Sequence, residues 1–222
     1  LHGEEITRLR QKQAEYLALQ NQINPHFLYN ALEAIRTDAL LANCPDIAET
    51  TEALATFFRY TISNVQEYVT FSDELDNAEN YFTIQRCRFG DKISLELELE
   101  NERLLEVRMP KLILQPLVEN AIHHGLPAGE ETGLIRVLGY QEDGDLFFSV
   151  SDNGDGIAPE ELAHLQDYIA GSNSDYTSIG LRNTHCRLEL FFGKPYGLSI
   201  RSVPGRGTSV TLRMPLMHKP FA

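Results

Sequence analysis

The most informative segment of the chain reads Asp152-Asn153-Gly154-Asp155-Gly156, and it follows a predicted β-strand over Leu146–Asp152. Its glycines permit backbone conformations that are closed to other residues, and they let a ligand approach closely. A carboxylate fixed at a strand end can accept the exocyclic amine of adenine, an N–H donor that guanine does not offer at that position. Short runs of this kind also build ordinary turns or calcium loops, although this one lacks the carboxylate-rich alternation and terminal glutamate of an EF-hand. An ordinary turn and a nucleotide site both stay open for this segment alone.

A second candidate group lies on a helix that we expect to open at Pro110 and to end at Gly125. Its Asn120 offers a neutral carbonyl oxygen that can complete an octahedral Mg²⁺ shell shared with phosphate oxygens, and the alternative is a capping or surface residue. His123 and His124 point roughly 100° apart on a helix. We therefore expect them at the surface or near phosphate, and not as joint metal ligands.

Two glycine-containing segments follow towards the C-terminus. Ile179-Gly180-Leu181-Arg182-Asn183 opens a helix directly after Gly171–Ser178, which is polar, lacks periodicity and is predicted to be a mobile loop. A helix N-terminus with a glycine is a ready phosphate site, because its N–H groups are free and the helix dipole favours an anion. Gly205-Arg206-Gly207-Thr208 lies near the last predicted strand, where it is a hairpin turn or part of a site.

A histidine with polar neighbours stands near the start of the chain, at His26. Imidazole is partly neutral near pH 7, so it can be a nucleophile without a strong base beside it. Gln22 and Asn30, at i−4 and i+4, share its helix face. Because of Pro25, either a long helix kinks just before His26, or Asn24 caps a helix that begins at Pro25. The alternative for His26 is a solvated histidine at a helix break.

The N-terminal part of the chain is expected to be a pair of helices. A helical pattern runs from about Glu4 to Asn43 with heptad seams that are apolar at about half their positions, which predicts a weak coiled coil. After a break at Cys44-Pro45-Asp46, a second helical pattern runs from Ile47 to Val65. Two antiparallel helices of this size cannot bury both apolar faces alone, so we expect a dimeric four-helix bundle.

The rest of the chain alternates predicted helices and strands, which indicates an α+β fold with helices on one face of a mostly antiparallel sheet. Ser72, with Asp73 and Glu74, predicts the start of a helix that stops near Gly90. A further helix is expected to start at Pro159-Glu160-Glu161 and another to run from Gly180 to Phe192. Strands are expected over Ile93–Leu99, near Val107 and Met109, and over Gly133–Tyr140, Leu146–Asp152, Leu198–Val203 and Thr208–Met214.

The composition of the chain limits which binding partners and which cellular compartment are expected. Among 222 residues, 32 acidic side chains face 19 basic ones, for a net charge of −13, so nucleic acid is not an expected partner. The three cysteines show no CxxC spacing, which favours a reducing compartment over a disulfide framework or a zinc site. There is no signal-peptide pattern and no apolar run near the ~20 residues of a membrane helix. Since the chain begins inside a helical pattern, at Leu1, we expect it to be part of a longer protein whose membrane part is left out.

The order of these segments resembles the ATP-binding domain shared by histidine kinases, gyrase-type ATPases and Hsp90, the Bergerat fold. In that order an asparagine on a helix is followed by DNGxG, GLxN and GxGT. Further stretches narrow the resemblance to the LytS-type sensor histidine kinases, from about Gln20 to Pro215. These stretches are Gln22–Asn30, Phe58-Arg59-Tyr60, Tyr81–Gln85 with Arg88-Phe89-Gly90, and Leu114–Ile122.

The resemblance implies a helical dimerisation and phosphoacceptor region over 1–68, an ATP-binding α/β sandwich over 69–217 and a tail over 218–222. It implies His26 as the phosphoacceptor, Asn120 as a ligand of Mg²⁺ held with ATP, and Asp152 as the residue that reads adenine. The other nucleotide-binding residues that it implies are Gly154, Gly156, Gly180, Leu181, Asn183, Gly205, Gly207 and Thr208. It also implies a homodimer, the receiver domain of a response regulator as partner, and a cytoplasmic location beneath a membrane-anchored sensor part.

The function that we expect is ATP-dependent autophosphorylation of His26, followed by phosphoryl transfer to an aspartate of a response regulator. One alternative is a gyrase-like or Hsp90-like ATPase, for which Glu119 is the nearest water-activating carboxylate, although it lies on a different helix face from Asn120. Another is a degenerate kinase kept as a nucleotide-binding dimer scaffold. Ser178 stands where the family usually has glycine, and Phe27 stands where many histidine kinases have an acidic residue, so the general base for His26 is not identified.

Overall fold

The structure is a computed structural model that describes residues 24–63, 68–125, 132–171 and 179–216. It consists of two compact units, residues 1–63 and 64–222, each of which is described by itself. The heptad seams before Asn24 lie outside the described residues, as do Gln22, Ser178 and the 218–222 tail. The functional boundary expected between residues 68 and 69 stays a prediction. In the described part of the chain, no helix combines the length and the apolar character that crossing a bilayer requires.

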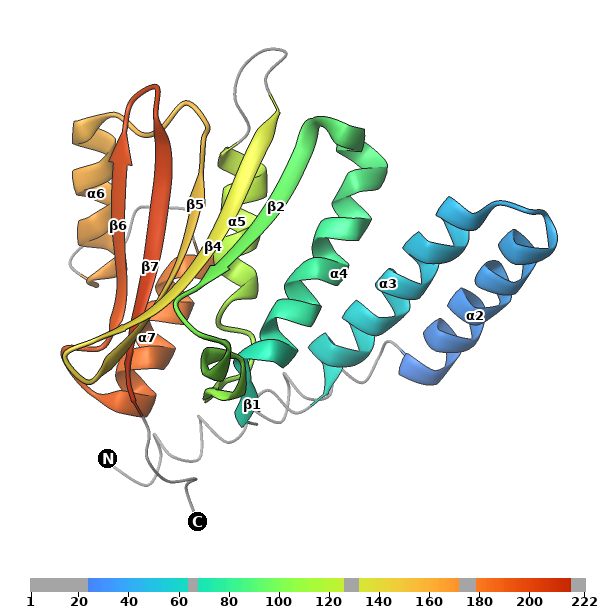
Figure 1. The fold of residues 1–222 in the computed structure, drawn as a ribbon, viewed down its shortest axis with the longest axis horizontal. Helices are drawn as coiled ribbons and strands as arrows, with labels where there is room; N and C mark the ends of the chain where they lie inside the picture. The colour runs from blue at the N-terminus through green and yellow to red at the C-terminus, as the bar shows by residue number, and fades with distance from the viewer. Residues whose placement is uncertain (1–23, 64–67, 126–131, 172–178, 217–222) are drawn as a thin grey trace, which may run out of the picture. The chain divides into compact units, whose positions relative to one another are not determined.

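The first unit is a helical hairpin of α2 (Pro25–Leu41) and α3 (Pro45–Ile62), drawn in blue in Figure 1. Its buried side chains are few and mostly small: Leu32, Ala39, Ala48, Thr51, Ala53 and Ala55. Larger apolar side chains stay exposed on both helices, namely Phe27, Ile35, Leu40, Leu41, Ile47 and Ile62. One hairpin therefore does not bury its own apolar surface, which is consistent with the dimeric bundle expected from the sequence.

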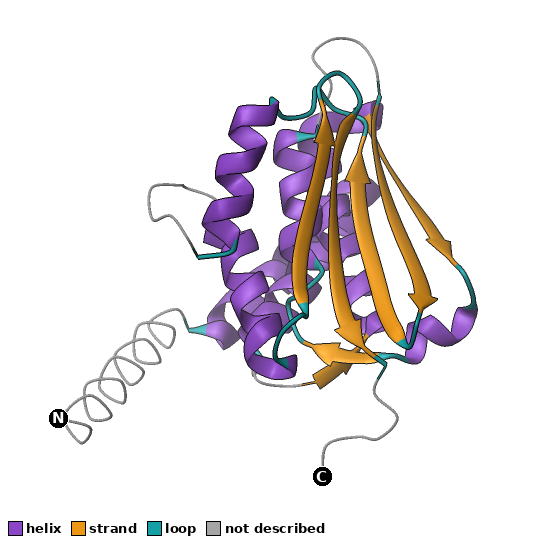
Figure 2. Ribbon diagram, turned by 90° about the vertical axis from the view of Figure 1, so that its left-hand side faces the viewer, coloured by secondary structure: helices purple, strands orange, loops and turns teal. Residues whose placement is uncertain are grey.

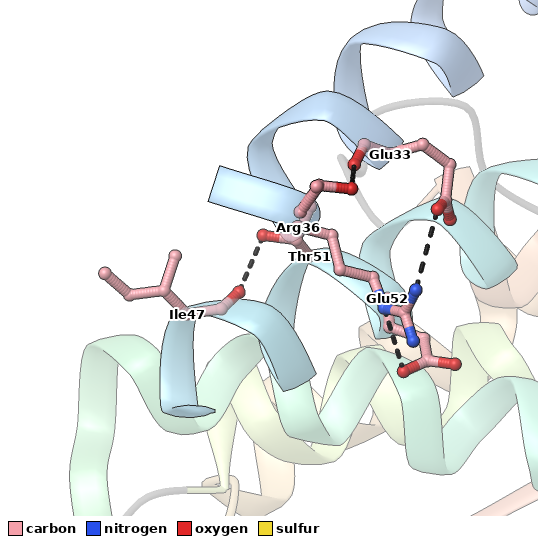
Figure 3. Close-up of polar contacts among 6 residues, drawn as sticks. Glu33, Arg36, Ile47, Thr51 and Glu52 are labelled. Carbon is pink, nitrogen blue, oxygen red and sulfur yellow. Dashed lines mark hydrogen bonds and ion pairs between the residues drawn. The ribbon is translucent and has the colours of Figure 1, made fainter. Parts of the chain in front are cut away.

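An ion pair joins the two helices, and further polar contacts lie within each helix (Figure 3). The guanidinium of Arg36 lies 3.6 Å from a carboxylate oxygen of Glu33 and 3.3 Å from one of Glu52 on α3. The hydroxyl of Thr51 donates to the carbonyl of Ile47 at 2.7 Å, within α3. Because all three charged groups are at least partly exposed, these ion pairs contribute little to the stability of the hairpin.

Helix α2 begins with a side-chain cap. The Oδ1 atom of Asn24 accepts the backbone N–H of His26 at 3.1 Å and that of Phe27 at 3.3 Å. Pro25 takes the first helical position, where its missing N–H costs nothing. Of the two alternatives that Pro25 left open, the structure has the capped start.

The second unit is a five-stranded sheet in the order β2-β4-β5-β7-β6 (Figure 1). Only β2 and β4 run parallel, and the other neighbours are antiparallel. The strands are β2 (Ile93–Leu99), β4 (Gly133–Glu142), β5 (Asp145–Asp152), β6 (Gly197–Val203) and β7 (Gly207–Pro215). A separate short ribbon pairs β1 (Tyr68–Thr70) with β3 (Arg108–Pro110). The sequence indicated β3 but gave no sign of β1.

Helices cover one face of this sheet (Figure 2), so the α+β architecture expected from the sequence is confirmed. They are α4 (Phe71–Phe89), α5 (Gln115–His124), α6 (Pro159–Ile169) and α7 (Ile179–Phe192), with short 3₁₀ turns at Gly90–Lys92 and Glu102–Glu106. The core lies between the two layers. The ring of Phe71 on α4 stacks on that of Phe148 on β5, with ring centroids 4.0 Å apart, and both side chains are fully buried.

The start of α4 differs from the prediction by two residues. Its N-cap is Thr70 and not Ser72: the N–H of Asp73 donates to the hydroxyl of Thr70 at 3.1 Å, and the N–H of Thr70 donates to the carboxylate of Asp73 at 2.8 Å. This reciprocal capping box satisfies two N–H groups at once, whereas a cap at Ser72 would satisfy one.

The start of α5 was predicted wrongly, because the helix begins at Gln115 and not at Pro110. Pro110 ends β3, and Leu112 has a positive φ of 58°, which no α-helix allows. The fully buried carboxylate of Glu74 on α4 accepts the N–H groups of the segment 112–114 at 2.6, 2.8 and 2.8 Å. These three bonds to a residue far away in sequence fix a non-helical segment that Pro110 alone would not have produced.

Candidate functional site

Asp152 stands at the end of β5, where hydrogen bonds hold one of its two carboxylate oxygens. Its Oδ1 atom accepts the backbone N–H of Gly154 at 3.0 Å and that of Thr208, at the start of β7, at 3.1 Å. Among the described residues, Oδ2 makes no hydrogen bond. The side chain is therefore held by the loop after β5 and by the start of β7, while it keeps one acceptor for an N–H group of a ligand.

The surroundings of Asp152 change its acidity. Burial raises the pKa of its carboxyl, while the N–H groups of Gly154 and Thr208 and the nearby charge of His124 lower it, and the net direction is upward. A carboxylate in such a partly desolvated place forms stronger hydrogen bonds than one in water. This is the environment in which a single acceptor can discriminate between ligands.

Three glycines bring separate elements into backbone contact around Asp152. Gly207 has a φ of +93°, and a Cβ placed there would overlap the carbonyl oxygen of Asp152. A Cβ on Gly125, which caps α5, would overlap the side chain of Asp152. A Cβ on Gly154 would lie 2.6 Å from the carbonyl carbon of Gly125. The end of α5, the loop after β5 and the start of β7 thus pack together only because all three positions are glycine.

Gly156 and Gly205 continue this arrangement between β5 and the β6–β7 hairpin. Gly156 has a φ of +69°, and a Cβ there would overlap the carbonyl oxygen of Val203. The N–H of Gly205 donates to the carbonyl of Asp155 at 2.7 Å. The DNGDG and GRGT segments, which are far apart in the chain, therefore form one structure, and the hairpin-turn alternative for Gly205–Thr208 does not describe all of their contacts.

Three residues of this structure were not identified as site residues from the sequence. Gly125 was expected only as a helix end. Asn153 fastens the loop to the start of β4, because its Oδ1 accepts the N–H of Leu134 at 2.6 Å. The hydroxyl of Ser202 donates to the carbonyl of Gly207 at 3.0 Å. The contacts of Gly125 and Asn153 join segments that are at least 19 residues apart, so no local sequence pattern predicts them, whereas Ser202 and Gly207 lie in one hairpin.

Asn120 lies on α5 with its side chain partly exposed and with no hydrogen bond to any described residue. Its neighbour Glu119 is directed to α4: the Nε2 atom of Gln115 donates to its Oε1 at 2.6 Å, and Asn77 on α4 donates to Gln115 at 2.8 Å. The two adjacent side chains thus face different surroundings, as the helix geometry predicts. Asn120 is available to a ligand, whereas Glu119 belongs to a polar network between helices.

The two histidines of α5 also have different neighbours. The Nε2 atom of His123 lies 3.1 Å from the hydroxyl oxygen of Tyr81 on α4. The charge of His124, by contrast, lowers the pKa of Asp152. Burial and the charge of Glu119 raise the pKa of Tyr81 to about 12, so its hydroxyl keeps its proton near neutral pH. In the described part of the chain, no three His, Cys, Asp or Glu side chains are grouped so as to hold a metal ion.

Helix α7 begins at Ile179, directly after the predicted loop. Residues 172–178 of that loop lie outside the described residues. Gly180 and Asn183 are exposed on this turn, and the hydroxyl of Thr184 donates back to the carbonyl of Gly180 at 2.9 Å. The side chain of Leu181 is buried in the core, which leaves its backbone for a ligand. Free N–H groups at such a turn suit an anion.

The structure thus brings together the predicted residues Asp152, Gly154, Gly156, Gly205, Gly207 and Thr208, and through Gly125 it joins them to the helix of Asn120. His26 belongs to the other unit, where it is exposed in the first turn of α2. Its Nδ1 atom lies 3.3 Å from Nδ2 of Asn30, and Gln22 lies outside the described residues.

Comparison with protein families gives two matches that together span most of the chain. Residues 14–93 match the family described as histidine kinase. Residues 105–218, more than half of the chain, match the family described as histidine kinase-, DNA gyrase B-, and HSP90-like ATPase. The second match contains every residue of the Asp152 site and Asn120.

Relatives and solved structures agree with these matches. The sensor histidine kinase YesM of Bacillus subtilis is 36% identical over 208 residues, 94% of this chain and 34% of the relative. The sensor protein LytS of the same organism is 34% identical over 211 residues, 93% of this chain and 35% of the relative. The chain therefore spans about a third of the length of these relatives. The catalytic domain of histidine kinase ThkA, at 18% identity and a TM-score of 0.51 over 68% of this chain and 96% of that one, shares the fold.

Proposed function

This chain belongs to the sensor histidine kinase family, and from that premise we propose that it carries out ATP-dependent autophosphorylation on His26 and passes the phosphoryl group to an aspartate of a response regulator. The observation that carries the proposal is the carboxylate of Asp152, with Oδ1 fixed by the N–H groups of Gly154 and Thr208 and Oδ2 open. A site with one directed acceptor suits a purine that presents an N–H donor.

Asp152 would select adenine by its hydrogen-bonding pattern. Its Oδ2 atom accepts one N–H of the exocyclic amine of adenine, whereas guanine presents a carbonyl oxygen at the same place and would meet it acceptor to acceptor. The glycine contacts at Gly125, Gly154 and Gly207 keep side chains out of the floor of this site. The residues present therefore fit ATP, and they disfavour GTP.

Asn120 and the start of α7 would hold the phosphate end. The free carbonyl oxygen of Asn120 is a suitable ligand for Mg²⁺, which supplies charge neutralisation on the phosphates when it is bound. The first turn of α7, with Gly180 and Asn183 exposed, offers backbone donors to anionic oxygens. With a net charge of −13, the chain depends on these few groups and not on a basic surface.

His26 would be the acceptor of the phosphoryl group. It is exposed, its Nε2 atom has no partner among the described residues, and one of its ring nitrogens contacts Asn30. A homodimer through α2 and α3, a response-regulator receiver domain as partner and an anchored sensor part beside the cytoplasmic portion belong to the same proposal. The exposed apolar residues of the hairpin support the first of these.

The ATPase alternative finds less support. Such an enzyme needs a carboxylate to activate water, and the nearest candidate, Glu119, is bound by Gln115 and directed to α4. Incubation with γ-labelled ATP separates the two functions. Acid-labile, base-stable label on the protein that disappears in His26→Gln supports the kinase, and release of free phosphate that is unaffected by this change supports the ATPase. ATP binding without any label, in the protein with its sensor part restored, would support a scaffold in which Ser178 has impaired the site.

A further inference from the structure

The two cations of the hairpin unit have different surroundings. Residues 24–63 contain two arginines, Arg36 and Arg59, and no lysine, against a larger number of carboxylates. Arg36 pairs with Glu33 on its own helix and with Glu52 on the other one (Figure 3). Arg59 makes no ion pair with a carboxylate of any residue that the structure describes. One guanidinium of the hairpin is thus neutralised, whereas the other keeps its full charge.

An aromatic ring holds Arg59 in place. The Cζ atom of its guanidinium lies 5.4 Å from the centroid of the Tyr29 ring on α2. Tyr29 is half-buried and Arg59 is exposed, so the ring attracts the cation while the N–H donors at the edge of the guanidinium stay accessible. The contact therefore positions a charged group at the surface without using its hydrogen bonds.

Arg59 and His26 lie on the same side of the hairpin. His26 precedes Tyr29 by three residues, so the two side chains share a face of α2 and lie about 4.5 Å apart along its axis. The cross-helix contacts of Arg36 with Glu52 and of Tyr29 with Arg59 are seven residues apart on each helix, so they belong to one side of the hairpin. His26 is the next position along this side, beyond Tyr29.

A phosphoryl group on His26 would place a strong negative charge beside this cation. Such a group carries about −1.5 to −2 charges near pH 7 and brings three strong acceptor oxygens. A guanidinium stays protonated at that pH and can bind two phosphoryl oxygens through parallel N–H donors. Among the described residues of the hairpin, Arg59 is the cation without a carboxylate partner, so it can offset this charge.

We propose that Arg59 is a phosphoryl-binding residue, which pairs with the γ-phosphate as it reaches His26 and with the phosphohistidine afterwards. The inference rests on the proposed function of His26 as the phosphoacceptor. In the transfer, the unprotonated ring nitrogen of His26 forms the bond to the γ-phosphorus of ATP, the bond from that phosphorus to the β,γ-bridging oxygen breaks, and ADP leaves with its electron pair. The remaining ring proton then passes to solvent. Arg59 donates hydrogen bonds to the phosphoryl oxygens and exchanges no proton.

The first test measures initial rates of labelling of the full chain by Mg-ATP. Arg59→Ala should lower the maximal rate about tenfold to a hundredfold, with the ATP concentration for half-maximal rate changed by less than about twofold, because the other unit holds the nucleotide. Arg59→Lys keeps the charge but not the parallel donors, and it should lose about threefold to tenfold.

Arg36→Ala is the matched control, since it removes the same charge from the same hairpin. Its maximal rate should stay within about twofold of the wild-type rate, because its ion pairs are exposed. Guanidinium chloride at millimolar concentration should restore part of the rate in Arg59→Ala by supplying the missing donors, and it should not accelerate Arg36→Ala.

Chemical phosphorylation gives a readout that does not depend on the kinase reaction. Phosphoramidate transfers a phosphoryl group to exposed histidines without ATP, and comparison with His26→Gln identifies the phosphorus NMR signal of His26. This signal should titrate about half a pH unit lower in the wild type than in Arg59→Ala, because the nearby guanidinium favours the dianion. Arg36→Ala should titrate as the wild type does.

The outcomes separate this inference from the proposed function. Rates and titrations that are the same in Arg59→Ala and the wild type would overturn the inference, as would an equal loss of rate in Arg36→Ala. If Mg-ATP leaves His26 unlabelled in the wild type, the proposed function itself fails. The titration of the chemically phosphorylated protein would still decide whether Arg59 binds a phosphoryl group.

Discussion

Glu74 on α4 and Arg187 on α7 bind opposite polar groups of one short segment, 111–114. The carboxylate of Glu74 accepts three successive N–H groups of this segment, and the guanidinium of Arg187 donates to the carbonyls of Lys111 and Leu112 at 2.8 and 3.4 Å. Burial lowers the pKa of Arg187, and the charge of Glu74 opposes this shift. Since the segment leads into the helix of Asn120, and α7 carries Gly180 and Asn183, the pair joins the two elements that we propose to hold the phosphates.

Replacing Glu74 should destabilise the ATP-binding unit strongly. In Glu74→Gln the charge is lost, and an amide NH₂ group faces N–H donors that have no water to turn to, so we expect a loss of about 3 kcal/mol in the free energy of unfolding. Urea denaturation followed by circular dichroism measures it. Glu79→Gln, an exposed residue on the same helix, is the control and should change stability by less than about 0.5 kcal/mol. Equal stabilities of the two variants would contradict the role of Glu74.

Alanine should act very differently at two glycines of the same turn. Gly207 and Gly205 both have positive φ, but a Cβ on Gly207 meets the carbonyl of Asp152, whereas a Cβ on Gly205 meets no atom within 4 Å. Gly205→Ala should cost about 1 kcal/mol of backbone strain and keep ATP binding. Gly207→Ala should lower the melting temperature further and weaken ATP binding at least tenfold. Calorimetric titration measures ATP binding, and thermal unfolding measures stability, in both variants. The comparison decides whether glycine is needed at position 207 for the close approach to the carbonyl of Asp152 or for the turn conformation.

Asp152→Asn should weaken ATP binding by about tenfold to a hundredfold. The amide oxygen of the new side chain takes the N–H groups of Gly154 and Thr208, so its NH₂ group faces the amine of adenine, donor against donor. Asp155→Asn, in the same loop, is the control. Titration with ADP and GDP measures the effect. Unchanged affinity and unchanged preference for adenine in Asp152→Asn would exclude Asp152 as the residue that reads the base.

Acidification should move nucleotide affinity and the contribution of Asp152 to stability in opposite directions. The pKa of Asp152 is raised in the folded protein, so its ionised form, which we propose accepts the adenine amine, is lost at a higher pH than for an ordinary aspartate. A group with a raised pKa contributes stability that is complete below its unfolded pKa and disappears as the pH rises through its folded pKa. We therefore expect ADP affinity to fall on acidification while this contribution to stability grows, and both pH dependences should be weaker in Asp152→Asn.

Asn120 should be needed for catalysis more than for binding of the base. Asn120→Ala removes the carbonyl oxygen proposed for Mg²⁺, so we expect most autophosphorylation to be lost while the affinity for adenosine, which has no phosphates, stays within about twofold. Labelling with Mg-ATP and titration with adenosine measure the two effects. Full labelling in the variant would remove Asn120 from the metal site, and lost adenosine binding would show that the change had disturbed the whole pocket.

The sequence predicted those parts of the molecule that depend on local patterns. The period-two segment at Ile93–Leu99 and the segment predicted at Leu146–Asp152 are strands, and Pro159 opens a helix as expected. The helix start predicted at Pro110 was wrong because Glu74, 38 residues before Leu112 in the chain, accepts N–H groups that a helix from Pro110 would have contained.

The candidate site was predictable to the same extent. The order of the glycine segments pointed to Asp152 and to the loops that contain Gly154 and Gly207. In the sequence Gly125 is only a helix end, and its contact with the side chain of Asp152 is visible only in the structure. Ser202 was missed for the same reason, because its partners come from two other segments. Residues that act through their own chemistry can be found in a sequence, whereas residues that act through close packing need the fold.

We propose that ATP held by the C-terminal unit phosphorylates one histidine of the helical hairpin. Mass-spectrometric mapping of the phosphorylated residue, after incubation of the full chain with Mg-ATP and under conditions that preserve phosphohistidine, tests it directly. We expect a phosphoryl group on His26 that is absent in His26→Gln, although this variant should bind ATP as the wild type does. Phosphorylation of another residue, or a level that is the same in His26→Gln, would contradict it.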